Sequence, residues 1–333
     1  MTSTLKSKLA LAALFASSHF PVDAAAFDDS FTTDPAARGW FAVGNSNLFH
    51  WNAAPGALEV TWDSREPNSY FARPLGTALT RTNDFCLVFD LKLADFTPNI
   101  DPTKNSASFQ LAVGLIRLAD ATVPGFHRGS GYESPNLCDF SFFPDPGGDW
   151  LYGPSLTAMM ADNTGFHWTS GGFAPGGLTT NDVFRVTMAY RAAEGVLHTE
   201  LLRNGQPFLP VPPAKLSPNF TDFQLDHVAV CSYNDAGQYP GYEGSLLAHG
   251  TVDNLSFAPW LPVNNLTAQP TYAGFEIHFD SRTTWLYTLQ RTTDWESWQP
   301  VSAALPGTDA PLTLTDPNPP AAHAFYRVKA AKP

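Results

Sequence analysis

The sequence predicts an all-β protein, in which a large two-sheet β-sandwich is followed by a small β-sandwich module. Three observations lead to this prediction. Apolar and polar residues alternate in many short runs, which puts the apolar side chains on one face of a strand. Turn-forming residues separate the runs, and the 333 residues include 24 Gly and 29 Pro. No stretch has the apolar spacing of an amphipathic helix.

Alternation is clearest in two runs of the large domain. In Phe85–Leu93 every second residue, starting with Phe85, is apolar. In Leu137–Phe143, Asp139 alternates with Cys138 and Phe140, so its side chain is expected on the opposite face of the strand. Further strands are expected at Phe27–Thr33, Ala57–Asp63, Ser69–Arg73, Ser108–Leu118, Ser155–Asp162, Val183–Tyr190, Val196–Arg203, Phe223–Ser232 and His249–Phe257.

The N-terminal residues 1–26 have the pattern of a secretory signal peptide. Lys6 and Lys8 precede the apolar run Leu9–Ala16, and Ala24–Ala26 supplies small residues for cleavage before Phe27. The apolar run is too short to span a membrane, which needs about 20 apolar residues. We therefore expect a secreted protein, in the extracellular space, in the periplasm or on the cell surface, with no membrane span.

Composition changes after residue 258. Residues 259–270 are rich in Pro and Asn, which predicts a linker between a large domain at 27–258 and a small module at 271–333. In the module, strands are expected at Tyr272–Phe279, Trp285–Arg291 and Ala324–Lys329.

Charge and cysteine content limit the partners and the chemistry. The formal net charge is −12, which argues against nucleic acid and anionic membranes because both require a basic surface. Neutral sugars and cations remain as ligands. Three cysteines, Cys86, Cys138 and Cys231, allow at most one disulfide. We favour buried free thiols over a Cys138–Cys231 bridge, because all three lie in strand-like runs.

Residues 27–258 resemble the concanavalin A-like lectin/glucanase superfamily, in the diverged form of bacterial exported proteins. The resemblance lies in FDDSF at Phe27–Phe31, GALEVTWDS at Gly56–Ser64 and HGTVDNLSF at His249–Phe257. It implies a jelly roll whose first and last strands lie close together. The glucanases carry two glutamates flanking an aspartate on one strand, as nucleophile and acid. This chain has no such run, so no catalytic residue is assigned.

Residues 271–329 resemble a small fibronectin-III-like module found at the ends of exported bacterial proteins. The resemblance is carried by YTLQRTTDWESWQPV at Tyr287–Val301 and FYRVK at Phe325–Lys329. It implies a role as a spacer or in surface presentation. We expect Trp295 and Trp298 to pack in the core and turns of the module, because a Trp buries a large area.

Candidate ligand-binding residues lie in two loop-rich segments. A sugar site needs an aromatic platform and a few polar groups. The first segment supplies Asp139, Trp150, Tyr152 and Trp168, and the second supplies Tyr233, Asn234, Tyr239 and Tyr242. A third set is Trp62, Arg65, Asn68 and Tyr70. We expect Asp120–Trp168 and Tyr233–Tyr242 to meet at one end of the sandwich, although each could instead only cap its own end of the core.

The metal and function predictions stay broad. Asp28 and Asp253 could hold a structural calcium ion if the first and last strands are neighbours; solvated strand-end carboxylates are the alternative. The leading function is an exported carbohydrate-binding or cell-surface recognition protein with a polysaccharide or glycan as partner. One alternative is a polysaccharide-degrading glycoside hydrolase or lyase with a non-standard site, which needs convergent acid–base groups. The other is a structural surface protein.

Overall fold

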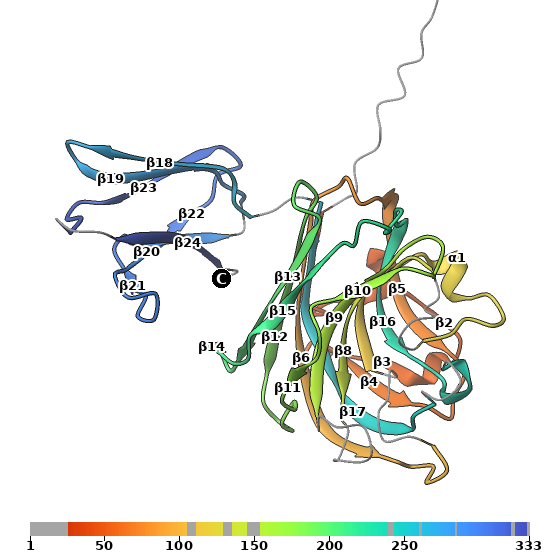
Figure 1. Ribbon diagram of the computed structural model, residues 1–333. Helices are drawn as coiled ribbons and strands as arrows, with labels where there is room; N and C mark the ends of the chain where they lie inside the picture. The colour runs from red at the N-terminus through yellow and green to blue at the C-terminus, as the bar shows by residue number, and fades with distance from the viewer. Residues whose placement is uncertain are drawn as a thin grey trace, which may run out of the picture.

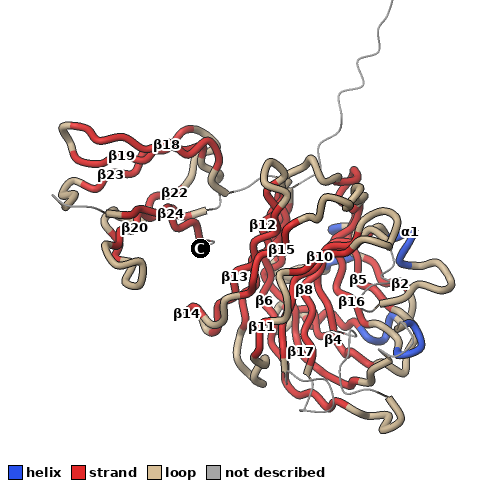
Figure 2. Tube along the Cα trace, viewed as in Figure 1, coloured by secondary structure: helices blue, strands red, loops and turns tan. Residues whose placement is uncertain are grey.

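The large domain is a jelly-roll sandwich of two antiparallel sheets packed face to face (Figure 1). The computed structural model describes residues 26–104, 111–128, 135–144, 154–238, 243–259, 262–283, 285–320 and 324–331. In this described part the chain is almost entirely strand and loop (Figure 2), with one short α-helix, α1 at Leu118–Ala121. The prediction of an all-β fold is therefore confirmed.

Sheet I contains the first and last strands of the large domain. In the described chain it has nine strands, ordered β14-β13-β12-β6-β17-β4-β3, with β1 beside β17 and β15 beside β13. Their bounds are β1 Phe27–Asp29, β3 Phe49–Asn52, β4 Ala57–Asp63, β6 Phe85–Pro98, β12 Phe184–Arg191, β13 Val196–Arg203, β14 Gln206–Pro207, β15 Val211–Lys215 and β17 Leu246–Ala258.

Sheet II lies opposite sheet I and carries the candidate site. Among the described residues it has eight strands, ordered β10-β9-β8-β7-β16-β5-β2, with β11 beside β9. Their bounds are β2 Phe41–Val43, β5 Ser69–Leu79, β7 Leu111–Ile116, β8 Leu137–Phe143, β9 Ser155–Ala161, β10 Trp168–Ser170, β11 Ala174–Pro175 and β16 Leu225–Ser232. Three 3-10 helices lie in loops: η1 Pro35–Arg38, η2 Ser46–Leu48 and η3 Asp235–Gly237.

Burial follows the alternation in the sequence. In β12, Phe184, Val186, Met188 and Tyr190 are buried in the core between the sheets, and the residues between them are partly exposed. Strand β8 differs because both of its faces are buried. Cys138 and Phe140 face the main core, whereas the outer face of sheet II has a second apolar cluster under the loops.

The cysteines are free and buried, as expected. Cys138 belongs to the main core between the sheets, and Cys231 belongs to the cluster on the outer face of sheet II. The two thiols therefore lie on opposite faces of one sheet, which explains why they form no bridge.

Residues 264–331, called the small domain from here on, form two further sheets. One has the order β18-β19-β23, and the other has β21-β20-β22 with β24 beside β20. Their bounds are β18 Asn264–Thr271, β19 Gly274–Asp280, β20 Leu286–Thr292, β21 Gln299–Pro300, β22 Leu305–Pro306, β23 Pro311–Asp316 and β24 Phe325–Ala331. Strand β18 thus begins inside the range expected to be a linker. None of the helices that the structure describes has the length and apolar content to cross a membrane.

Candidate functional site

Three loops meet at one end of sheet II. They are residues 64–68 between β4 and β5, residues 122–128 after α1, and residues 233–238 after β16. The Arg128 amide donates to the Gly237 carbonyl (2.9 Å), and the Asn234 amide donates to Asn68 Oδ1 (2.7 Å). The described parts of the two segments singled out in the sequence are therefore neighbours in space, as expected.

These loops border an open groove with a volume of about 520 Å³. Arg65, Asn68 and His127 supply its polar groups, and Val123 and Pro124 supply exposed apolar surface. The Arg65 guanidinium is held by Asp63, with Nε at 2.8 Å and Nη2 at 2.5 Å from the carboxylate oxygens. These hydrogen bonds from Arg65 lower the pKa of Asp63, so the carboxylate stays charged and fixes the arginine beside the groove.

Asn234 shapes one wall of the groove. Its Oδ1 accepts from the Ala236 amide (2.6 Å), and its Nδ2 donates to the Glu66 carbonyl (2.6 Å) and to the Ser64 carbonyl (3.2 Å). The side chain that was expected to contact ligand is thus occupied in joining two loops. Its contribution to the groove is to hold the walls in place.

A polar cluster lies under the loop that contains Phe126 and Arg128. Arg128 Nη2 is 3.2 Å from both oxygens of Asp139 and 3.4 Å from Ser141 Oγ. Arg128 and Asp139 both have no exposed surface. Burial raises the pKa of Asp139, and the positive charge of Arg128 opposes that shift. The expected outward direction of Asp139 is confirmed, but its carboxylate is ion-paired rather than open to solvent.

An aromatic cluster lies beside this ion pair. The Arg128 guanidinium carbon is 5.4 Å from the ring centroid of Tyr233. The Tyr233 ring stacks on Phe126 with centroids 5.7 Å apart, and Tyr70 meets its edge at 5.9 Å. Tyr233 is fully buried, so its ring is not an open surface for a sugar. Burial also raises the pKa of Tyr233 well above its usual value.

The remaining candidates divide into two groups. Trp168 lies in β10, half-buried against the cluster on the outer face of sheet II. Trp150, Tyr152, Tyr239 and Tyr242 lie outside the described residues. From the third set, Trp62 and Tyr70 are buried, whereas Arg65 and Asn68 line the groove.

Arg128 was missed by reasoning from the sequence. One signal could have found it, because a buried strand aspartate requires a positive partner. Arg128 is the one Lys or Arg between Asp120 and Trp168 in the sequence.

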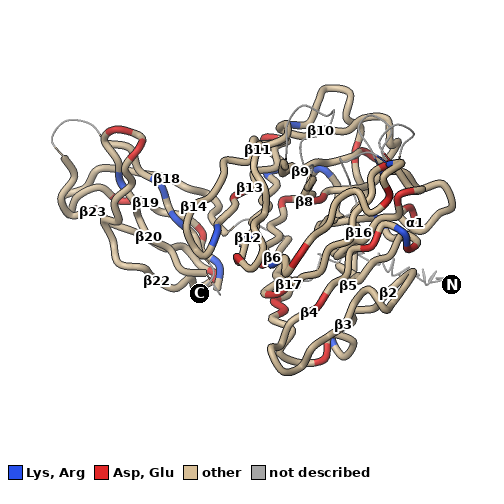
Figure 3. Tube along the Cα trace, turned by 90° about the horizontal axis from the view of Figure 1, so that it is seen from below, with Lys and Arg blue, Asp and Glu red and all other residues tan. Residues whose placement is uncertain are grey.

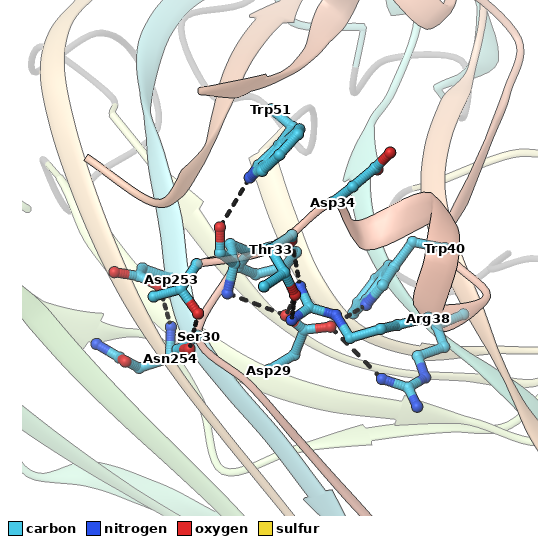
Figure 4. Close-up of polar contacts among 12 residues, drawn as sticks. Asp29, Ser30, Thr33, Asp34, Arg38, Trp40, Trp51, Asp253 and Asn254 are labelled. Carbon is cyan, nitrogen blue, oxygen red and sulfur yellow. Dashed lines mark hydrogen bonds and ion pairs between the residues drawn. The ribbon is translucent and has the colours of Figure 1, made fainter. Parts of the chain in front are cut away.

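The region proposed for calcium is organised around a different carboxylate (Figure 4). Strands β1 and β17 are paired, as that prediction required, with Asp28 opposite Ser256. Asp29 is the buried carboxylate there, and it accepts from Trp40 Nε1 (2.6 Å) and pairs with Arg38 (2.6 Å). In the described ranges no three His, Cys, Asp or Glu side chains are grouped so as to hold a metal ion. A calcium ion at Asp28 and Asp253 stays a prediction.

Comparison with known proteins yields structural likenesses alone. No family model and no curated protein matches the chain. Solved structures similar to it include a Lotus tetragonolobus seed lectin, with TM-score 0.47, 12% identity and coverage of 70% of this chain and 97% of the lectin. Lectin II from Ulex europaeus has TM-score 0.46, 13% identity and coverage of 71% and 99%. An alginate lyase mutant in complex with alginate trisaccharide has TM-score 0.36, 12% identity and coverage of 70% and 93%. Likenesses at these scores carry nothing about the ligand of this chain.

Proposed function

We propose that this chain is an exported carbohydrate-binding protein, and that the groove between the three loops receives the sugar. The observation that carries the proposal is the groove itself, an open surface groove of about 520 Å³ that has both polar and apolar residues in its walls. This volume lies within the roughly 300–1,000 Å³ of small-molecule sites in proteins. Export rests on residues 1–26, of which 1–25 lie outside the described residues.

The groove has hydrogen-bond donors in fixed positions. Asn68 Oδ1 holds the Asn234 amide, whereas Asn68 Nδ2 has no hydrogen-bond acceptor among the described residues. Arg65 is 61% exposed and presents its remaining N–H groups to solvent. Loops already tied to one another lose little freedom on binding, which favours affinity for a small hydroxyl-rich ligand.

Two buried side chains, Asp139 and Tyr233, favour sugar binding over catalysis, because neither is available as an acid or a base. A glycoside hydrolase needs two carboxyl groups flanking the substrate, but Asp139 is fully buried and paired with Arg128. A lyase that uses tyrosine as base needs the hydroxyl to lose its proton. The raised pKa of Tyr233 opposes that loss. A purely structural spacer predicts no groove, whereas this chain has one between the three loops.

Charge supports an uncharged or weakly charged glycan. Acidic residues are distributed over both domains (Figure 3), and the net charge is −12.

The small domain, which we propose to be fibronectin-III-like, has the two-sheet arrangement that such a module requires.

The test is retention of the secreted chain on a glycan array and on immobilised polysaccharides. We expect Arg65→Ala to weaken binding by roughly tenfold or more, because a charged hydrogen bond contributes about 1.5–3 kcal/mol. Arg203→Ala is the matched control: Arg203 forms a similar surface ion pair with Asp182 (2.6 Å) in sheet I. No retention on any glycan, or equal retention by the Arg65 variant and the unaltered chain, would contradict the proposal.

A further inference from the structure

The turn after β20 in the small domain carries an exposed tryptophan in an unusual backbone conformation. Trp295 has φ +64°, in the left-handed region that bulky residues rarely adopt. Its side chain is 63% exposed, which differs from the expectation that it packs inside the module. Backbone strain of this kind costs free energy and persists where surrounding contacts enforce it, often at binding sites.

Hydrogen bonds of the turn enforce this conformation. The Asp294 carboxylate accepts from the amides of Glu296 (2.9 Å) and Ser297 (2.8 Å). The Thr292 hydroxyl accepts from the Trp295 amide (3.1 Å) and donates to Asp294 (2.7 Å). Hydrogen bonds from the Thr292 hydroxyl and from the amides of Ser297 and Glu296 lower the pKa of Asp294 to about 2, so its carboxylate is charged at neutral pH.

The indole of Trp295 is supported from one side. The centroid of its ring lies 3.9 Å from the centroid of the Phe325 ring, at an interplanar angle of 36°. Trp298 meets it at nearly a right angle, with centroids 6.2 Å apart. The Arg327 guanidinium carbon lies 4.3 Å over the Trp298 ring. Phe325 therefore packs against the ring of Trp295, and most of the Trp295 side chain is exposed to solvent.

We propose that Trp295, supported by Phe325 and flanked by Trp298, is a stacking platform for a pyranose ring of a saccharide. This inference rests on the proposed carbohydrate-binding function and adds a second contact point in the small domain. Trp is a large, rigid ring with a polar N–H at its edge, which suits the apolar face and hydroxyl rim of a sugar.

A sugar fits this platform better than a protein does. Trp295 is a single exposed ring, and the other large exposed apolar residues of the small domain lie elsewhere: Leu266 in β18, Tyr272 in the turn before β19 and Leu305 in β22. A stable protein interface buries about 800 Å² on each partner. One pyranose ring, in contrast, is covered by one indole.

The test measures dissociation constants of the full secreted chain for cellohexaose, laminarihexaose and xylohexaose by calorimetry and tryptophan fluorescence. Trp295→Ala is expected to weaken binding at least tenfold, with a melting temperature within a few degrees of the unaltered chain. Trp295→Tyr is expected to retain most of the binding, since it keeps a ring on Phe325. Tyr272→Ala, which removes a fully exposed ring from the same domain, is expected to change nothing.

Variants of the groove separate this inference from the proposed function. Loss of binding in Trp295→Ala but not in Arg65→Ala supports the platform and overturns the groove. Loss in Arg65→Ala alone overturns the platform and leaves the groove standing. Unchanged binding in Trp295→Ala, or a Trp295→Tyr chain with normal melting temperature and no binding, contradicts the platform. Absence of binding by the unaltered chain to all three probes and to the glycan array overturns both.

Discussion

At the residue scale, Arg128 and Asp139 depend on each other. Burying the two charged side chains away from water costs desolvation free energy. Their mutual attraction offsets this cost only while both charges are present. Ser141 Oγ lies 3.3 Å from Asp139 Oδ1 and adds a hydrogen bond to the pair. The cluster therefore tolerates loss of one charge poorly.

Arg128→Met is expected to lower the free energy of unfolding by about 3–5 kcal/mol at pH 8, because it leaves a buried carboxylate unpaired. The loss is expected to shrink as pH falls. Burial raises the pKa of Asp139 in the folded state above its value in the unfolded state. The contribution of protonated Asp139 to the free energy of unfolding is therefore fully present below the unfolded-state pKa, and it is lost as pH rises through the folded-state pKa. Urea unfolding at pH 5 and pH 8 measures this difference.

The control for this pH dependence is the double variant Arg128→Met, Asp139→Asn. It has no titrating group at the site, so its stability relative to the unaltered chain is expected to differ less between the two pH values. An equal loss for the single Arg128→Met variant at pH 5 and pH 8 would show that Asp139 does not carry the effect.

At the element scale, the close approach of β7 and β8 requires a glycine. Gly114 in β7 lies opposite Asp139 in β8. A Cβ at position 114 would lie 2.3 Å from the Cys138 carbonyl oxygen and 2.5 Å from the Asp139 Cα. Both are backbone atoms, so the clash could be relieved only by moving the strand that carries Asp139.

Gly114→Ala is therefore expected to lower the free energy of unfolding by more than about 3 kcal/mol, among the larger effects of single substitutions. Gly205→Ala is the comparison, because Gly205 has φ +78° and open space around its Cα. That change costs strain alone, about 1–2 kcal/mol. Urea denaturation curves compare the two, and a smaller loss for Gly114→Ala than for Gly205→Ala would refute the close-approach argument.

At the scale of the whole molecule, the two domains share an apolar contact. Cys86 and Val88 on the outer face of β6 belong to the same buried cluster as Phe279, Trp285 and Tyr287 of the small domain. The Tyr287 hydroxyl also donates to the Pro262 carbonyl (2.6 Å), which ties the connecting segment to the small domain. The two domains are thus in direct contact through this apolar cluster.

Val88→Asp is expected to separate the domains, because it puts a charge into a contact where Val88 is 3% exposed. Limited proteolysis of this variant is expected to cut between residues 259 and 263 several times faster than in the unaltered chain. Ala94→Asp, an exposed position on the same strand, is the control. Equal cleavage rates for the two variants would mean that the contact does not hold the domains together.

The sequence by itself determined most of the long strands of the large domain and the direction of their side chains. Ala57–Asp63, Leu137–Phe143 and Val196–Arg203 have the expected bounds, because side chains at every second position of a strand share one face and a core-facing row of apolar residues is visible in the sequence. Only the tertiary structure decided that Arg128 pairs with Asp139, that Asn68 meets Asn234, and that Trp295 is exposed. The first two contacts depend on which loops become neighbours after distant strands pair, and the exposure of Trp295 depends on the backbone angle of a single turn. A periodic pattern of apolar residues in the sequence reports neither of these.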